Sequence, residues 1–341
     1  MLYPGNGLRI PQMYYFGSFR PDPPQPCSSS HELRQRRMVY VPKKLSRGPK
    51  AGLLQEATTV DGKVILITGG TSGIGKAAAT NLAAMGAWVV VTGRSRERGE
   101  SAVEEIIRDS GGGQASLMLA DFSSQSEVRE LAEKFAQRYD RLDVLINNAG
   151  VVNSRRVETE DGIEGTLAVN HLAPFLLTNL LLDLLKRSAP SRIVTVSSEA
   201  RRGAKIDFDD LQSEHRYKGF RVYGMTKLAN ILFTYELAER LRGSGVVANC
   251  LHPGAVNTRF ASNNRGIMAV LFRLLKPFMR SPGQGADTAV WLAAAPEAGE
   301  ISGQYLMDRE VISTVEEPHD EAARKRLWAV SEELTNPRIA S

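Results

Sequence analysis

The sequence predicts an α/β fold in which helices cover both faces of a parallel, doubly wound sheet. Short apolar strands alternate with helical segments from Val64 to about Gly254, and this alternation is typical of parallel sheets. The β-branched run Val64–Ile67 has the composition of a strand buried on both faces. A length of 341 residues is enough for one large α/β domain. We therefore expect a single domain over residues 59–341.

A glycine-rich turn follows the first strand. The segment Thr68–Gly75 reads T-G-G-T-S-G-I-G, and a helical run over Lys76–Met85 comes next and stops at Gly86. Glycines let a backbone approach a pyrophosphate, whose charge is stabilised at a helix N-terminus. The spacing is not the commoner G-x-G-x-x-G, and a plain strand-to-helix turn is the alternative interpretation. The residues expected to bind a dinucleotide are Gly69, Thr71, Ser72, Gly73, Ile74 and Gly75.

The end of the second strand indicates which dinucleotide is bound. NAD-preferring sites usually carry an acidic residue near this point, which binds the ribose 2′-hydroxyl. Here the strand Ala87–Thr92 is followed by Gly93-Arg94, and no acid occurs before Glu97. A guanidinium binds phosphate oxygens in a bidentate way. Arg94 therefore predicts NADP (NADPH) as the cofactor, with NAD and a merely solvated arginine as alternatives.

A tyrosine and a lysine lie one helical turn apart later in the chain. Apolar residues recur with helical spacing over Gly224–Arg240, which places Tyr223 and Lys227 on the same face. A nearby ammonium stabilises a phenolate and lowers the pKa of the tyrosine, which suits acid–base catalysis. An ordinary helix surface often shows the same pair.

Two further strands end in polar residues. The strand Arg192–Val196 is followed by Ser197 and Ser198, and a strand beginning at Leu142 is followed by Asn147-Asn148-Ala149-Gly150. Open α/β sheets bind ligands at the carboxyl ends of their strands, so a serine there is placed to polarise a carbonyl. Two serines that cap a turn are the ordinary interpretation.

Together these segments resemble the short-chain dehydrogenase/reductase family over roughly residues 60–335. The resemblance rests on five motifs in the family's order. It is closest to the retinol-dehydrogenase-like branch, which has an N-H-L-x-x-F-L-L-T segment and a similar 25-position gap between serine and tyrosine. That gap indicates Ser198 rather than Ser197 as the family serine. The matching segments are Thr68–Gly75, Asn147–Gly150, Asn170–Thr178, Tyr223–Lys227 and Pro253-Gly254.

The resemblance implies a Rossmann fold and an NADP-preferring oxidoreductase that interconverts an alcohol and an aldehyde or ketone by hydride transfer. It implies that Tyr223 is the acid/base, that Ser198 binds the reacting oxygen, and that Lys227 holds the nicotinamide ribose and lowers the pKa of Tyr223. A non-catalytic nucleotide-binding scaffold or sensor is the alternative. The remaining implied contacts are Asn170 to a water near Lys227, Asp121 to the adenine, Asn148 near the adenine ribose, and Val256 and Thr258 to the nicotinamide amide and phosphates.

The first 58 residues are expected to form a disordered, basic, proline-rich extension. Residues 1–50 carry nine Lys and Arg against two Asp and Glu, and eight of the sixteen prolines. A solvated tail, an organelle-targeting segment and a stretch upstream of a native start at Met38 all fit this composition. The basic clusters are too sparse to predict nucleic-acid binding. No run of 18 apolar residues occurs, so no transmembrane segment is expected.

The segment after Pro253 indicates the character of the substrate. Gly266–Arg280 combines apolar and basic residues, and in the family it lies over the substrate. We expect a substrate lid at about residues 255–282 and an apolar, retinoid-, steroid- or lipid-like substrate. Peripheral membrane contact and a core-packed helix pair are alternatives. Cys27 and Cys250 are far apart, which fits a reducing, cytoplasmic compartment. No metal site is expected, and a homodimer is left open.

Overall fold

A computed structural model describes residues 60–256, 279–312 and 320–336. The predicted extension over residues 1–58 lies outside the described residues. So do Thr258 and most of the predicted lid, of which only residues 255–256 and 279–282 are described.

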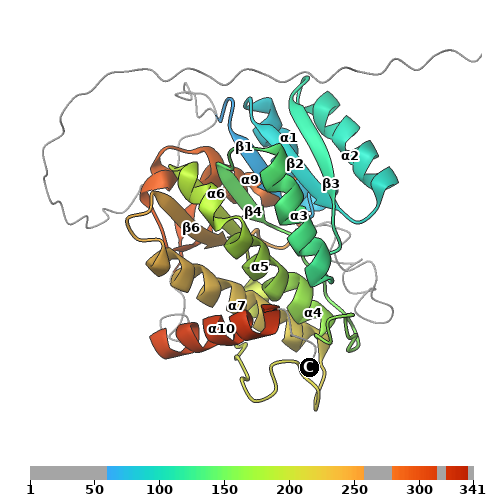
Figure 1. Ribbon diagram of the computed structural model, residues 1–341, viewed down its shortest axis with the longest axis vertical. Helices are drawn as coiled ribbons and strands as arrows, with labels where there is room; N and C mark the ends of the chain where they lie inside the picture. The colour runs from blue at the N-terminus through green and yellow to red at the C-terminus, as the bar shows by residue number, and fades with distance from the viewer. Residues whose placement is uncertain (1–59, 257–278, 313–319, 337–341) are drawn as a thin grey trace, which may run out of the picture. The chain divides into compact units, whose positions relative to one another are not determined.

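One eight-stranded sheet forms the centre of the molecule (Figure 1). Its strand order is β3-β2-β1-β4-β5-β6-β7-β8, and every pairing is parallel except that of β7 with β8. The predicted doubly wound parallel sheet is thereby confirmed. Strand order reverses between β1 and β4, which is where such sheets bind their ligands. The strands are β1 Val64–Ile67, β2 Trp88–Gly93, β3 Gln114–Leu119, β4 Val144–Asn147, β5 Ser191–Val196, β6 Val246–Leu251, β7 Tyr305–Met307 and β8 Glu310–Val311.

Helices cover both faces of this sheet because successive strand residues point to opposite sides. In β1, Ile65 and Ile67 belong to one core cluster and Leu66 to the other. One layer comprises α1 Gly73–Ala84, α2 Arg96–Asp109 and α9 Pro282–Ala294. The other layer is built on α3 Gln125–Arg138, α5 Ala173–Leu180 and α7 Gly219–Arg240. Shorter or peripheral elements are α4 Gly165–Leu167, α6 Leu182–Arg187, α10 Glu321–Thr335, the π turn η1 Ala168–Leu172, and the 3₁₀ turns η2 Glu199–Arg201 and η5 Glu297–Glu300.

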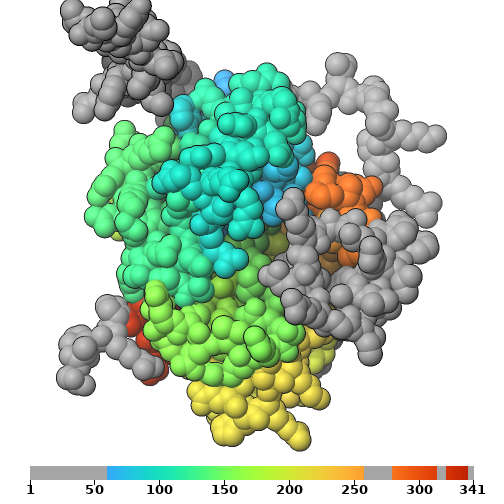
Figure 2. All heavy atoms as spheres, turned by 90° about the vertical axis from the view of Figure 1, so that its right-hand side faces the viewer, coloured from blue at the N-terminus to red at the C-terminus, as the bar shows by residue number. Residues whose placement is uncertain are grey.

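The helix α7 begins five residues earlier than its apolar spacing predicts. Its first turn contains the exposed residues Phe220 and Arg221 and only one buried apolar residue, Val222, so the apolar spacing is weak there. Tyr223 therefore lies inside the helix rather than at its edge. The segment between η2 and α7, drawn in yellow, protrudes at the lower end of the molecule (Figures 1 and 2).

The helix α10 packs along α7 (Figure 1). Trp328 stacks on Phe233 with ring centroids 5.9 Å apart, and its edge meets Phe175 at 5.0 Å. The guanidinium of Arg240 lies 4.1 Å from the Trp328 ring centroid, which adds a cation–π contact. Within the described part of the chain, no helix is both long and apolar enough to cross a bilayer.

Candidate active site

The glycine turn has a backbone that side chains would obstruct. Gly69 and Gly73 have φ angles of +64° and +56°, in the left-handed region that favours glycine. A Cβ atom on Gly75 would come within 2.5 Å of both the Gly69 carbonyl oxygen and the Asn148 side-chain nitrogen. The turn leads into α1, whose first turn carries no acidic residue. This is a cradle suited to the pyrophosphate of a dinucleotide.

Thr68 and Asn148 brace this turn, and sequence reasoning missed that role for both. The Thr68 hydroxyl accepts hydrogen bonds from the backbone N–H groups of Asn148 at 2.9 Å and Ala149 at 3.0 Å. The Asn148 side-chain amide donates to the Thr68 carbonyl at 2.8 Å. The Asn148 amide is thus hydrogen-bonded to the turn itself, and its expected place near the adenine ribose remains a prediction. The two residues are 80 positions apart, so no local pattern reveals the contact.

The other expected turn residues lie around the start of α1. Ser72 is the N-cap residue of α1, and its side chain makes no capping hydrogen bond to the helix. Thr71 lies against the end of β2, since a Cβ on Gly93 would come within 2.7 Å of its methyl carbon. Ile74 packs at the edge of the α1–α9 core, where an added Cβ on Gly285 would meet it at 3.3 Å.

Arg94 and Asp121 lie close together at the ends of neighbouring strands. Arg94 follows β2, Asp121 follows β3, and their charged groups are 3.6 Å apart. The Arg94 side chain is 61% exposed, so it is accessible to a ligand. Burial opposes ionisation of Asp121, but hydrogen bonds from Ser123 and the charge of Arg94 outweigh it and hold the pKa below its usual value. An exposed guanidinium thus lies beside the glycine turn.

Ser198, Tyr223 and Lys227 meet where β5, η2 and α7 come together. Ser198 follows β5 and is the N-cap residue of η2, and its hydroxyl is hydrogen-bonded to the phenol of Tyr223. The Lys227 ammonium lies 5.6 Å from the centroid of the Tyr223 ring. The structure therefore brings these three side chains together, and their catalytic roles remain predictions.

The pKa of Tyr223 is shifted upwards, whereas the family resemblance implies that Lys227 lowers it. Burial raises it to about 12, and the hydrogen bond from Ser198 lowers it only in part. The expected lowering by Lys227 is not found, because the Lys227 ammonium donates to the Val196 carbonyl at 3.0 Å rather than to the phenol. Burial also lowers the pKa of Lys227 to about 8. At pH 7 both side chains are therefore mainly protonated.

The two serines after β5 have different environments. The Ser197 hydroxyl is buried and donates to the Lys227 carbonyl at 2.7 Å. The Ser198 hydroxyl instead accepts from the Ala200 N–H at 3.2 Å and contacts Tyr223. Ser197 thus joins β5 to α7, and Ser198 is the serine that lies against the tyrosine.

The side chain of Asn170 is hydrogen-bonded to the backbone of a neighbouring loop. Its side-chain oxygen accepts from the Val151 N–H at 2.7 Å, and its nitrogen donates to the Val151 carbonyl at 2.9 Å and to the Thr226 hydroxyl at 3.1 Å. Asn170 lies in the π turn η1, a wide turn that is common at functional sites. Thr226 also donates to the Tyr223 carbonyl at 2.8 Å. Asn170 is therefore connected through Thr226 to α7, the helix that carries Tyr223 and Lys227.

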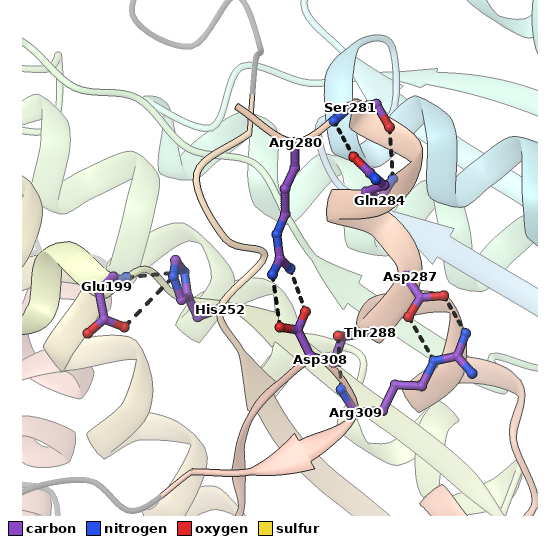
Figure 3. Close-up of polar contacts among 9 residues, drawn as sticks. All are labelled: Glu199, His252, Arg280, Ser281, Gln284, Asp287, Thr288, Asp308 and Arg309. Atoms are coloured by element: carbon purple, nitrogen blue, oxygen red, sulfur yellow. Dashed lines mark hydrogen bonds and ion pairs between the residues drawn. The ribbon is translucent and has the colours of Figure 1, made fainter. Parts of the chain in front are cut away.

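The Pro253-Gly254 turn packs against Arg280, which forms an ion pair with Asp308. Figure 3 shows Arg280 directing both terminal nitrogens to Asp308, with the Nη2–Oδ2 distance at 2.8 Å. A Cβ on Gly254 would come within 2.7 Å of the Arg280 side chain. Val256 forms a bridge with Arg280 immediately after the turn. The expected contacts of Val256 with a nicotinamide remain a prediction.

Comparison with known proteins defines the family. Residues 63–266 match the model described as short chain dehydrogenase. The chain is 42% identical to human retinol dehydrogenase 14 over 305 residues, which cover 85% of this chain and 89% of that protein. It is also 42% identical to mouse retinol dehydrogenase 12 over 283 residues, which cover 83% and 89% of the two chains.

Solved structures agree with this assignment. A putative uncharacterized protein from Mycobacterium paratuberculosis superposes with a TM-score of 0.67 at 31% identity, covering 81% of this chain and 94% of that one. A short chain dehydrogenase from Burkholderia cenocepacia J2315 in complex with NADP gives a TM-score of 0.58 at 29% identity, with 72% and 96% covered. The chain belongs to the short-chain dehydrogenase/reductase family. Within it, the chain falls in the retinol-dehydrogenase-like branch and is an NAD(P)-dependent oxidoreductase acting on CH–OH groups.

Proposed function

We propose that this enzyme interconverts an apolar alcohol and its aldehyde or ketone, with NADP(H) as the preferred cofactor. The observation that carries the proposal is the contact between Ser198 and Tyr223, with Lys227 beside them at the strand ends. A non-catalytic scaffold would have no chemical need for this cluster, and no observation favours that alternative.

The side chains have distinct roles in the proposed reduction. The cofactor, when bound, supplies hydride to the carbonyl carbon. Tyr223 donates its proton to the carbonyl oxygen, and its raised pKa keeps that proton in place at pH 7. Ser198 hydrogen-bonds the same oxygen. Lys227 contributes a buried positive charge beside the phenol and binds the cofactor ribose, while Asn170 and Thr226 hold the helix that carries both residues.

The preference for NADP rests on Arg94. Its guanidinium is exposed beside the glycine turn, where a bidentate contact with a 2′-phosphate is favourable. No acid follows β2 until Glu97, so the usual ligand of an NAD ribose is missing from this position. The relative from Burkholderia cenocepacia, whose structure contains NADP, supports the same choice.

The proposed substrate is apolar and retinoid-like. The curated relatives are named retinol dehydrogenases, which supports all-trans-retinal as the first compound to test. Phe220 supports an apolar substrate independently, because 59% of its surface is exposed one turn before Tyr223, with ring centroids 6.3 Å apart. An exposed aromatic ring beside the acid is suited to a long unsaturated chain.

A panel of carbonyl compounds tests the proposal. The protein would be mixed with NADPH or NADH and with all-trans-retinal, a saturated aldehyde of similar length, a steroid ketone or a short polar aldehyde. Loss of cofactor absorbance would be followed. We expect the highest kcat/KM with NADPH and a long apolar carbonyl. Reduction of only the short polar aldehyde, or equal use of NADH, would contradict the substrate or cofactor assignment respectively.

A further inference from the structure

His252 is a buried titratable side chain between two parts of the active site. It follows β6 and directly precedes the Pro253-Gly254 turn, and only 6% of its surface is exposed. The reaction proposed above does not use it as a proton carrier. Burying an imidazole is costly unless its nitrogens are hydrogen-bonded. The hydrogen-bond partners of His252 therefore indicate the role of this residue.

Both ring nitrogens of His252 face the residue that follows Ser198. The Glu199 backbone N–H donates to Nδ1 at 3.2 Å, and Nε2 lies 3.7 Å from the Glu199 carboxylate (Figure 3). Because Nδ1 accepts a hydrogen bond, the neutral ring must carry its proton on Nε2, on the side of the carboxylate. His252 therefore holds Glu199 through its backbone N–H, while the Glu199 carboxylate also pairs with Arg202.

The surroundings of the ring favour this neutral form. Burial, followed by the positive charges around it, lowers the pKa of His252 to about 4, while Asp308 acts in the opposite direction. The ring is consequently an acceptor at neutral pH. The charged groups that face it are Glu199, Arg201, Arg202, Arg280 and Asp308.

The turn η2 is fixed at two further points. Arg201 is 5% exposed, and its guanidinium lies 5.0 Å from the ring centroid of Tyr305 in β7. The Ala200 carbonyl packs against Gly224, where an added Cβ would come within 2.5 Å of the oxygen. Since Gly224 follows Tyr223, η2 connects the catalytic serine to the catalytic tyrosine.

We propose that His252 is a positioning residue, which fixes the Ser198 hydroxyl against Tyr223 by binding the backbone of Glu199. The proposal rests on the function proposed above, because it concerns the same reaction. Removing the imidazole leaves the partly buried N–H group of Glu199 without its acceptor. The start of η2 is then no longer fixed at this point. The Ser198 hydroxyl then loses its alignment, while the glycine turn and its bracing residues are unchanged.

The experiment compares His252→Leu with His252→Asn, using NADPH and all-trans-retinal. Leucine removes the acceptor, whereas asparagine places an oxygen near the position of Nδ1. The control Asn249→Ala removes two other partly buried hydrogen bonds between a β6 side chain and the backbone, at 2.8 and 3.0 Å, away from η2. We expect kcat to fall about tenfold in His252→Leu, as for one lost hydrogen bond. NADPH affinity should stay within about twofold, and kcat should be largely kept in His252→Asn and Asn249→Ala.

A second comparison shows whether the effect passes through Ser198. In a Ser198→Ala background, His252→Leu should lower kcat by less than about twofold, because no hydroxyl is left to position. Hydrogen exchange of the peptide containing Glu199 should become faster in His252→Leu but not in Asn249→Ala. A tenfold loss that persists in the Ser198→Ala background, or unchanged exchange at Glu199, would overturn the proposal. If the unmodified protein reduces no carbonyl at all, the proposed function fails, and exchange at Glu199 still decides whether His252 holds the turn.

Discussion

At the scale of single residues, burial decides the charge state of Tyr223 and Lys227, the proposed catalytic pair. Tyr223 and Lys227 both keep their protons at pH 7, although burial moves their pKa values in opposite directions, to about 12 and about 8. The tyrosine is thus ready to act as an acid, and the lysine contributes charge rather than a hydrogen bond to the phenol. The four-residue spacing predicted that the two residues share one helix face. The spacing alone does not show how burial and hydrogen bonding set their pKa values.

A prediction at this scale concerns Arg94. Replacing it in Arg94→Ala should lower the preference for NADPH over NADH by about tenfold, measured as the ratio of dissociation constants. A charge-assisted contact with phosphate contributes about 1.5–3 kcal/mol, and exposure to solvent and the nearby Asp121 carboxylate place this one at the low end. The matched control is Arg96→Ala, because Arg96 is 72% exposed and pairs with Glu100 on α2. An unchanged ratio in Arg94→Ala would show that another group selects the cofactor.

At the scale of elements, local patterns predicted the strands and the catalytic helix but not the contacts between them. The runs around Val64 and Arg192 have a composition that is sufficient to identify buried strands, and their polar ends form the site. The hydrogen bond from Asn148 to Thr68 in the glycine turn joins residues 80 positions apart. The hydrogen bond from Glu199 to His252 joins residues 53 positions apart. Such contacts depend on how strands are ordered in the sheet, so a single sequence does not reveal them.

The contact between His171 and α10 leads to a prediction about how the free energy of unfolding depends on pH. His171 is 1% exposed, and its Nε2 contacts the Ser331 hydroxyl of α10 at 2.9 Å. Burial lowers the pKa of His171 from 6.5 to about 4. The unfolded chain therefore binds this proton more strongly than the folded one, and the free energy of unfolding should decrease as pH falls from about 6.5 towards 4.

For this one histidine, the expected loss between pH 7 and pH 5 is about 2 kcal/mol. Urea unfolding at the two pH values measures it. The variant His171→Gln cannot titrate and should show a smaller difference between the two pH values, even if it is less stable at pH 7. An equal pH dependence in both proteins would show that other groups, such as His252, account for the acid sensitivity.

At the scale of the whole molecule, the described domain carries all of the assigned catalytic groups. The first 55 residues lack the apolar periodicity that a core requires, so ordering them would cost conformational entropy without burial in return. We predict that deleting residues 1–55 changes Tm by less than about 2 °C and leaves NADPH binding intact. A deletion through Ile67 is the control, since it removes the central strand β1 and should prevent folding. A loss of several degrees in the shorter deletion would show that this segment stabilises the domain.

The central claim is that Tyr223 supplies the proton, and the variant Tyr223→Phe tests it most directly. The ring and its packing are retained, but the hydroxyl is lost. General acid catalysis contributes about 10²–10⁴-fold, so kcat with the best carbonyl should fall by at least that range. NADPH binding should change little, whereas Lys227→Ala should weaken both binding and turnover.

Tyr217→Phe is the matched control for this measurement. Tyr217 is also partly buried with a pKa raised to about 12, but its hydroxyl lies within hydrogen-bonding distance of two other acceptors, the Asn153 carbonyl and the Glu164 carboxylate. The measurement is kcat beside NADPH titration for Tyr223→Phe, Tyr217→Phe and the unmodified protein. Loss of turnover of at least 10²-fold in Tyr223→Phe alone, with cofactor binding kept, is the predicted result. Near-normal turnover in Tyr223→Phe would contradict the assignment of the acid and the mechanism built on it.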